Sequence, residues 1–229
     1  MDSGRDLAVV LVSGGMDSAV VAAIACRDAE AAFLHLDYGQ ITEARERRAF
    51  EAIADHYRAG RRLVARVDPL GKIGGSSLTD ATMRVADARR GPSSTPTTYV
   101  PFRNTHFLAA AVSWGEVLGA RSIYIGAVEE DSSGYPDCRE PYIEAFNELI
   151  RLGTRPETRL RVMAPLLHLR KPEIVQEGLR LGAPFHLTWS CYAESEEACG
   201  QCESCLLRLR GFREAGVDDP IPYRMPDRR

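Results

Sequence analysis

The feature that most constrains this chain is a turn of glycines and hydroxyls, Ser13-Gly14-Gly15-Met16-Asp17-Ser18, set between two apolar runs. The run before it, residues 7–12, has no polar alternation, which is typical of a strand covered on both faces. The run after it, residues 19–26, predicts a helix. Glycines let the backbone approach an anion, and a helix N-terminus presents free N–H groups to it. The turn therefore predicts a phosphate site, with an ordinary strand-to-helix turn as the alternative.

The alternation of strand and helix continues along the chain and predicts the fold class. It favours an α/β fold with a doubly wound, mostly parallel sheet, in which ligands bind at the carboxyl ends of the strands. The length suits a single domain over residues 1–229. Residues 71–98, rich in Gly, Ser, Thr and Pro, predict a long loop. Further strands are expected at 31–36, 62–67, 122–125 and 160–163, and further helices at 42–57 (with Thr42 as N-cap), 105–119, 141–152 and 171–181.

Charge and hydropathy exclude several classes of protein. The formal net charge of −3 argues against a mainly electrostatic nucleic-acid binder. No stretch approaches the length of apolar sequence that a membrane-spanning helix needs. The first residues lack signal-peptide character, so a cytoplasmic protein is expected.

Four of the six cysteines fall within fifteen residues near the C-terminus: Cys191, Cys199, Cys202 and Cys205. Disulfides are uncommon in a reducing compartment, so this cluster needs another explanation. Four thiolates at this spacing suit a closed tetrahedral zinc site, whose role is structural because no position is left for water. An iron–sulfur cluster and a redox dithiol are the alternatives. We expect one zinc-binding subregion at residues 188–213.

Three arginines follow the cysteines and raise the possibility of a nucleic-acid surface. A zinc ribbon can bind nucleic acid, but four nearby glutamates largely cancel this positive charge. The sequence favours a solvated helix face for Arg208, Arg210 and Arg213.

Two other segments combine turn formers with groups that can orient a small polar ligand. Arg103 and Asn104 precede a predicted helix, where a guanidinium could hold a carboxylate or phosphate; a helix cap with a surface arginine is the alternative. Residues 126–139 follow a predicted strand and carry acids, hydroxyls and an aromatic ring. Such groups could read the edge of a purine-like base, or form a structured acidic loop. Cys138 could act as a nucleophile, but no paired histidine is apparent.

Four motifs occur in the order seen in one known family. They are Ser13-Gly-Gly-Met-Asp-Ser18, Val100-Pro-Phe-Arg-Asn104, Ser133-Gly-Tyr-Pro-Asp-Cys-Arg139 and Trp189-Ser-Cys-Tyr192 with the Cys-x-x-Cys-x-x-Cys that follows. From about residue 8 to residue 213 the chain resembles the 7-cyano-7-deazaguanine synthases, a family of PP-loop ATP pyrophosphatases with an adenine nucleotide alpha hydrolase-like fold. It departs from the family at Phe102, where many members have glycine, and in a slightly shorter gap between the first two clustered cysteines.

The resemblance implies a carbon–nitrogen ligase (EC 6.3.4 type) that converts 7-carboxy-7-deazaguanine, ammonia and ATP into the 7-cyano compound, a precursor of queuosine. It implies that Asp17 serves Mg²⁺, and that Arg103 or Arg139 meets substrate or phosphate charge. Asp131 or Asp137 would meet the base edge or ammonia. A homodimer without nucleic-acid or membrane partners is expected, as is free ammonia as the nitrogen source. Ser13, Gly14, Gly15 and Ser18 are expected to hold the phosphates, and Leu11, Met16 and Asp17 to complete the ATP-binding set.

Two other classes of function are open to the same chain. One is another PP-loop enzyme, such as a tRNA-thiolating relative, which would need a catalytic cysteine pair or a basic RNA face. The other is a non-catalytic nucleotide-binding or zinc-ribbon module, which Asp17 and the complete substrate motif disfavour.

Overall fold

The apolar run near the N-terminus forms the central strand of a parallel sheet. In the computed structural model, which describes residues 4–83, 95–129 and 135–224, five strands pair in the order β3-β2-β1-β4-β5, and every pair is parallel. The chain order reverses at β1, and such a switch point is where sheets of this kind bind ligands. The strands are β1 (Leu7–Leu11), β2 (Glu30–Asp37), β3 (Arg61–Arg66), β4 (Ser122–Tyr124) and β5 (Arg161–Met163).

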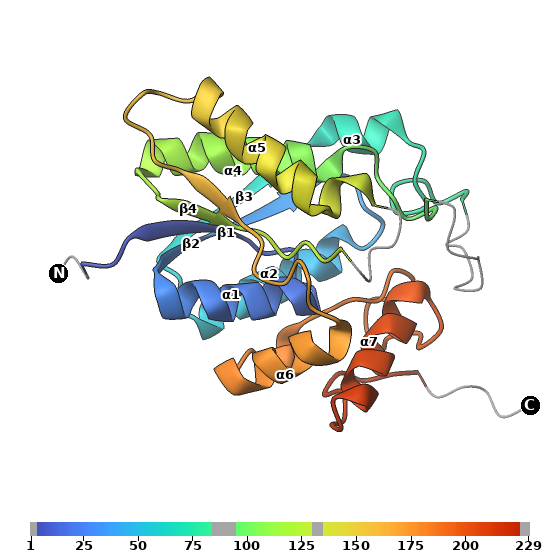
Figure 1. Cartoon of the computed structure of the whole chain (residues 1–229). Coiled ribbons are helices and arrows are strands. Elements are labelled where there is room, and N and C mark those ends of the chain that lie inside the picture. The colour runs from blue at the N-terminus through green and yellow to red at the C-terminus, as the bar shows by residue number, and fades with distance from the viewer. Residues whose placement is uncertain (1–3, 84–94, 130–134, 225–229) are drawn as a thin grey trace, which may run out of the picture.

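Helices cover both faces of the sheet, which confirms the predicted doubly wound α/β fold (Figure 1). Ala8 and Val10 of β1 point into the core on one face, whereas Val9 and Leu11 point into the core on the other. This double burial explains why the strand has no polar alternation. One face is covered by α1 (Met16–Asp28) and α2 (Glu43–His56), and the other by α4 (Arg103–Leu118) and α5 (Glu140–Gly153).

The C-terminal part forms an additional layer outside α1. Helix α6 (Lys171–Leu181) packs on α1, and α7 (Glu203–Glu214) packs on α6 (Figure 1). Residues 188–224, which we call the four-cysteine segment, have a small apolar core of their own that includes Ala49 of α2. A single bridge, between Ala198 and Tyr223, is the only strand-like pairing within the described residues of this segment.

The predicted elements match the structure except at several boundaries. Helix α4 begins at Arg103 rather than at residue 105, and the short helices α3 (Asp68–Ile73) and η1 (Pro136–Cys138) were not expected. Residues 84–94 of the expected loop lie outside the described residues. Thr42 is the residue before α2, but its hydroxyl donates to Glu46 and does not cap the helix. In the described part of the chain, every helix is too short or too polar to cross a membrane.

Candidate active site and metal centre

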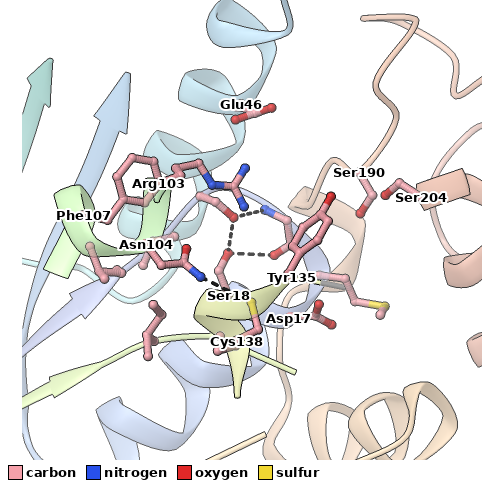
Figure 2. A pocket seen from close by; sticks show the side chains of 18 of the residues that line it. Asp17, Ser18, Glu46, Arg103, Asn104, Phe107, Tyr135, Cys138, Ser190 and Ser204 are labelled. Atoms are coloured by element: carbon pink, nitrogen blue, oxygen red, sulfur yellow. Dashed lines mark hydrogen bonds between the residues drawn. The ribbon is translucent and has the colours of Figure 1, made fainter. Parts of the chain in front are cut away.

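A cavity of about 280 Å³ lies at the carboxyl ends of the central strands, where the sheet order reverses. Its walls include the turn after β1, the end of β2, the start of α4, residues after β4 and the four-cysteine segment. Figure 2 shows Arg103 and Asn104 on one side of the cavity and Ser190 and Ser204 on the other, with Tyr135 between them. The cavity is therefore lined by residues that are far apart in the sequence.

The turn after β1 supplies the floor of the cavity, and we call residues 13–18 the Ser13–Ser18 loop. The Ser13 hydroxyl accepts a hydrogen bond from the Gly15 amide at 3.2 Å, and the Ser18 hydroxyl donates to the Gly15 carbonyl at 2.9 Å (Figure 2). Helix α1 begins directly after Gly15, and no side chain caps it. Its first N–H groups are therefore free to meet an anion at the positive end of the helix dipole.

Gly14 makes the tight turn of this loop possible. Its φ of +90° lies in the region that favours glycine, and a Cβ there would sit 2.6 Å from the Glu46 carbonyl oxygen. Gly14 itself lies outside the cavity wall, whereas the other residues of the predicted ATP-binding set line it: Leu11, Ser13, Gly15, Met16, Asp17 and Ser18.

Asp17 pairs with a lysine that the sequence analysis missed. Lys171, at the start of α6, donates to Asp17 Oδ2 at 2.8 Å, and its side chain is largely buried. The other carboxylate oxygen, Asp17 Oδ1, is buried and has no hydrogen-bond partner in the described residues. An orphaned carboxylate oxygen beside the Ser13–Ser18 loop fits a hard cation such as Mg²⁺. The two residues are 154 positions apart, so only the tertiary fold brings them together.

Arg103 enters the cavity from the first turn of α4 and lies among aromatic rings. Its Nη1 donates to the Tyr38 hydroxyl at 3.2 Å, and its guanidinium carbon lies 5.6 Å from the Tyr38 ring and 5.7 Å from the Phe107 ring. Burial raises the pKa of Tyr38 to about 12, so the phenol stays neutral beside the arginine. No carboxylate of the described residues forms an ion pair with Arg103. The guanidinium is thus available to an anionic ligand.

The motif at residues 135–139 fixes the start of α4. Asp137 Oδ2 accepts a hydrogen bond from the backbone N–H of Asn104 at 3.0 Å, and Asn104 Nδ2 donates to the Asp137 carbonyl at 2.9 Å. Asn104 Nδ2 also donates to Cys138 Sγ at 3.3 Å (Figure 2). Asp137 is buried away from the cavity wall, whereas Cys138 and Asn104 line it. Arg139 is exposed and donates to the Pro136 carbonyl. Asp131 lies outside the described residues.

The four clustered cysteines form a site that fits a zinc ion. Their sulfur atoms all lie within 4.8 Å of one another, and Cys199 Sγ is 3.9 Å from Cys205 Sγ. Four sulfurs bound tetrahedrally to one zinc ion lie about 3.8 Å apart. Backbone N–H groups also point at the sulfurs, as the Cys199 amide does toward Cys191 Sγ at 3.4 Å. Such donors stabilise thiolates, the form that binds a metal.

Arg208 corrects one expectation from the sequence. Its side chain is 1% exposed and forms a two-pronged pair with Asp219, with distances of 2.7 and 2.8 Å. It also donates to the Thr188 hydroxyl at 2.6 Å. The predicted solvated face therefore holds for Arg213 but is wrong for Arg208. The partner Asp219 lies eleven residues away across a turn, which the helical pattern of the sequence could not indicate.

The fold is the predicted parallel α/β class, with the Ser13–Ser18 loop at its switch point and a cluster of four cysteines near the C-terminus. A model of the family described as queuosine biosynthesis protein QueC matches residues 7–216. A relative named 7-cyano-7-deazaguanine synthase, from Chlorobium phaeobacteroides, is 57% identical over 94% of this chain and 96% of its own length. One of the same name from Acidobacterium capsulatum is 57% identical over 97% and 99%. The chain belongs to the queuosine biosynthesis protein QueC family.

The solved structures that match this chain have much lower sequence identity to it. An NAD⁺ synthetase from Burkholderia pseudomallei is 16% identical, with a TM-score of 0.46 over 98% of this chain and 71% of that chain. An NMN synthetase from Francisella tularensis is 12% identical, with a TM-score of 0.45 over 98% and 90%.

Proposed function

We propose that this protein uses ATP to convert 7-carboxy-7-deazaguanine and ammonia into 7-cyano-7-deazaguanine, by way of the amide. The proposal is supported by the family, by the name its relatives carry, and by a cavity that combines an anion-binding loop with an unpaired guanidinium. It makes the chain a carbon–nitrogen ligase of the EC 6.3.4 type. The single observation that carries the nucleotide part is the uncapped start of α1 at the Ser13–Ser18 loop.

The loop residues would hold the phosphates of ATP. Ser13 and Ser18 line the cavity together with Leu11 and Met16, and no side chain caps the start of α1 beside them. Asp17 would hold Mg²⁺ through its unpartnered Oδ1, while the hydrogen bond from Lys171 to Oδ2 orients the carboxylate. Mg²⁺ would supply charge neutralisation on the phosphates.

The chemistry needs activation because a carboxylate is a poor electrophile. A carboxylate oxygen takes an adenylyl or phosphoryl group from ATP, and ammonia then displaces that oxygen with its new group to give the amide. A second activation on the amide oxygen, followed by loss of two N–H protons and the C–O bond, gives the nitrile. The protein has to align the reactants and stabilise developing charge.

Arg103 is our candidate for the substrate carboxylate or the transferred phosphate. Asp137 would position Arg103 indirectly, because it accepts a hydrogen bond from the backbone at the start of the helix that carries Arg103. A contact of Asp131, Asp137 or Arg139 with the base or with ammonia remains a prediction.

The four-cysteine site would hold one structural zinc ion, and the residues present fit it. We also propose a cytoplasmic homodimer that acts on small molecules and binds no nucleic acid, in line with the net charge of −3. The family resemblance supports the dimer, and its test is the mass of the protein in solution.

The deciding experiment incubates the purified protein with 7-carboxy-7-deazaguanine, ATP, Mg²⁺ and ammonium, and follows the amide and nitrile by mass spectrometry. Asp17→Asn should lower the rate by about a hundredfold or more, since the metal ligand contributes several kcal/mol of charge stabilisation. Asp28→Asn, at the exposed end of the same helix, is the matched control and should leave the rate unchanged. Absence of nitrile with folded, metal-loaded protein would contradict the proposal.

A further inference from the structure

The four-cysteine segment contributes a wall of the cavity, although a structural metal site needs no such position. Tyr192 directly follows Cys191, and Glu203 and Ser204 lie between Cys202 and Cys205. These three neighbours of the cysteines all line the cavity. A metal ion held by the cysteines would therefore fix the backbone beside these three cavity residues.

This wall is attached directly to the Ser13–Ser18 loop. The Trp189 amide donates to the Gly14 carbonyl at 2.8 Å, and the guanidinium carbon of Arg45 lies 4.2 Å from the centre of the Trp189 ring. Within the segment, the buried Arg208 of α7 donates a hydrogen bond to the Thr188 hydroxyl, next to Trp189. Side chains of the four-cysteine segment are thus held in a fixed position relative to the expected phosphate site.

Glu203 is the carboxylate of this cavity that has no partner of its own. Asp17 is paired with Lys171, and Glu46 accepts hydrogen bonds from Gln40 at 3.1 Å and Thr42 at 2.6 Å. The Glu203 carboxylate has neither an ion pair nor a hydrogen bond with any residue in the described ranges, yet the residue is half-buried and lines the cavity. An acid at the first position of a helix is favoured by the dipole, but that preference does not require it to face a cavity.

Tyr135 lies within electrostatic reach of the two unpaired charges of the cavity. Burial raises the pKa of the Tyr135 phenol, the hydrogen bond with Thr98 and the charge of Arg103 lower it, and the charge of Glu203 raises it. Its ring also packs 5.6 Å from that of Tyr99. A flat heterocycle that contacts Tyr135 would thus have a cation and a carboxylate within reach.

We propose that Glu203 recognises the aminopyrimidinone edge of a deazaguanine, accepting hydrogen bonds from its ring N–H and its exocyclic amino group. The inference rests on the proposed function, because it takes the substrate class from there. The 7-carboxylate lies on the five-membered ring, and the two donors lie on the far edge of the six-membered ring. Arg103 and Glu203 offer the complementary charges, and a carboxylate meets two adjacent N–H donors in the two-pronged geometry it prefers. The Ser204 hydroxyl would assist at the same edge.

The test measures binding of 7-carboxy-7-deazaguanine and of its analogue without the 2-amino group, by titration calorimetry without ATP. The unmodified protein should prefer the amino-bearing ligand by about tenfold to a hundredfold, as expected for a charge-assisted hydrogen bond. Glu203→Gln should lose most of that preference, because its amide would place a donor against a donor, while ATP binding stays unchanged. Glu214→Gln, at the exposed end of α7, is the matched control.

The outcomes separate the two proposals. If the unmodified protein binds neither ligand, the proposed function fails. If it prefers the amino-bearing ligand and Glu203→Gln keeps the preference, only the role of Glu203 is overturned. Zinc content and thermal unfolding are measured for each variant. Should Glu203→Gln lose zinc, Glu203→Asp decides, since it keeps the charge but shortens the reach: weaker binding of the amino-bearing ligand alone supports the proposal, and unchanged binding overturns it.

Discussion

The Ser13–Ser18 loop and the four-cysteine segment face the same cavity, but different interactions hold them in shape. The loop is fixed by backbone geometry: it leaves a buried strand, turns at Gly14 and enters a buried helix. The four-cysteine segment has one isolated bridge in place of a sheet, a small apolar core, a cluster of four cysteines and a buried ion pair. The shape of the Ser13–Ser18 loop is thus determined by residues adjacent in the sequence. The shape of the four-cysteine segment depends on contacts between residues that are farther apart in the sequence.

This contrast predicts where single substitutions act. Changes in the four-cysteine segment should be costly wherever they leave buried sulfur or charge without its partner. Changes in the loop should be costly where they alter the backbone conformation.

The largest effect is expected at the proposed zinc site. Cys205→Ser removes one of four thiolates and should abolish tight zinc binding, with a loss on the order of 5 kcal/mol and a Tm lower by about 10–20 °C. Atomic emission gives the zinc content and calorimetry gives the Tm. Cys26→Ser, outside the cluster, is the control. A Cys205→Ser protein with normal zinc content and normal Tm would show that a metal ion bound by these cysteines does not stabilise the four-cysteine segment.

The buried ion pair should give the next largest effect. Arg208→Met replaces the aliphatic part of the side chain but leaves the Asp219 carboxylate, 3% exposed, without its cation. We expect a loss of about 3–5 kcal/mol of unfolding free energy in urea, at constant zinc content. Arg213→Met, on the exposed side of the same helix, should change stability by less than about 0.5 kcal/mol. Equal effects of the two substitutions would show that the pair does not stabilise the segment.

Gly14→Ala tests the loop. The new methyl group would meet the Glu46 carbonyl oxygen at 2.6 Å with the backbone at a φ of +90°, so we expect a loss of about 2 kcal/mol and weaker ATP binding. Gly60→Ala is matched to it, because nothing lies within 4 Å of that position and its φ is ordinary. It should be neutral or slightly stabilising. ATP affinity that is equal in both variants would count against the loop as the phosphate site.

The same contrast explains what the sequence could and could not predict. The alternation of apolar runs and helices predicted the sheet and its layers, because burial on both faces leaves a local signal at β1. The Ser13–Ser18 loop and the four cysteines were found because their spacing is itself the signal. The partners Lys171 and Asp219 were missed, since each is a single charged residue whose meaning appears only when a distant element packs beside it. Cavity residues of the four-cysteine segment, such as Glu203, were missed for the same reason.

The smallest effect is expected at Phe102, and it has the opposite sign. This residue precedes α4 with a φ of +60° and a ψ of 22°, a left-handed conformation that costs a non-glycine residue about 1–2 kcal/mol. Its side chain is 58% exposed, so the ring contributes little by packing. Phe102→Gly should therefore stabilise the protein by roughly 0.5–1 kcal/mol, after the greater freedom of glycine in the unfolded chain is subtracted. Phe102→Ala keeps the strained backbone and should give no gain in urea unfolding, so the pair of variants separates relief of strain from loss of the ring. If both variants are more stable than the unmodified protein, the Phe102 side chain, and not its backbone conformation, is destabilising. The start of α4 would then differ from the Ser13–Ser18 loop, whose shape depends on backbone conformation.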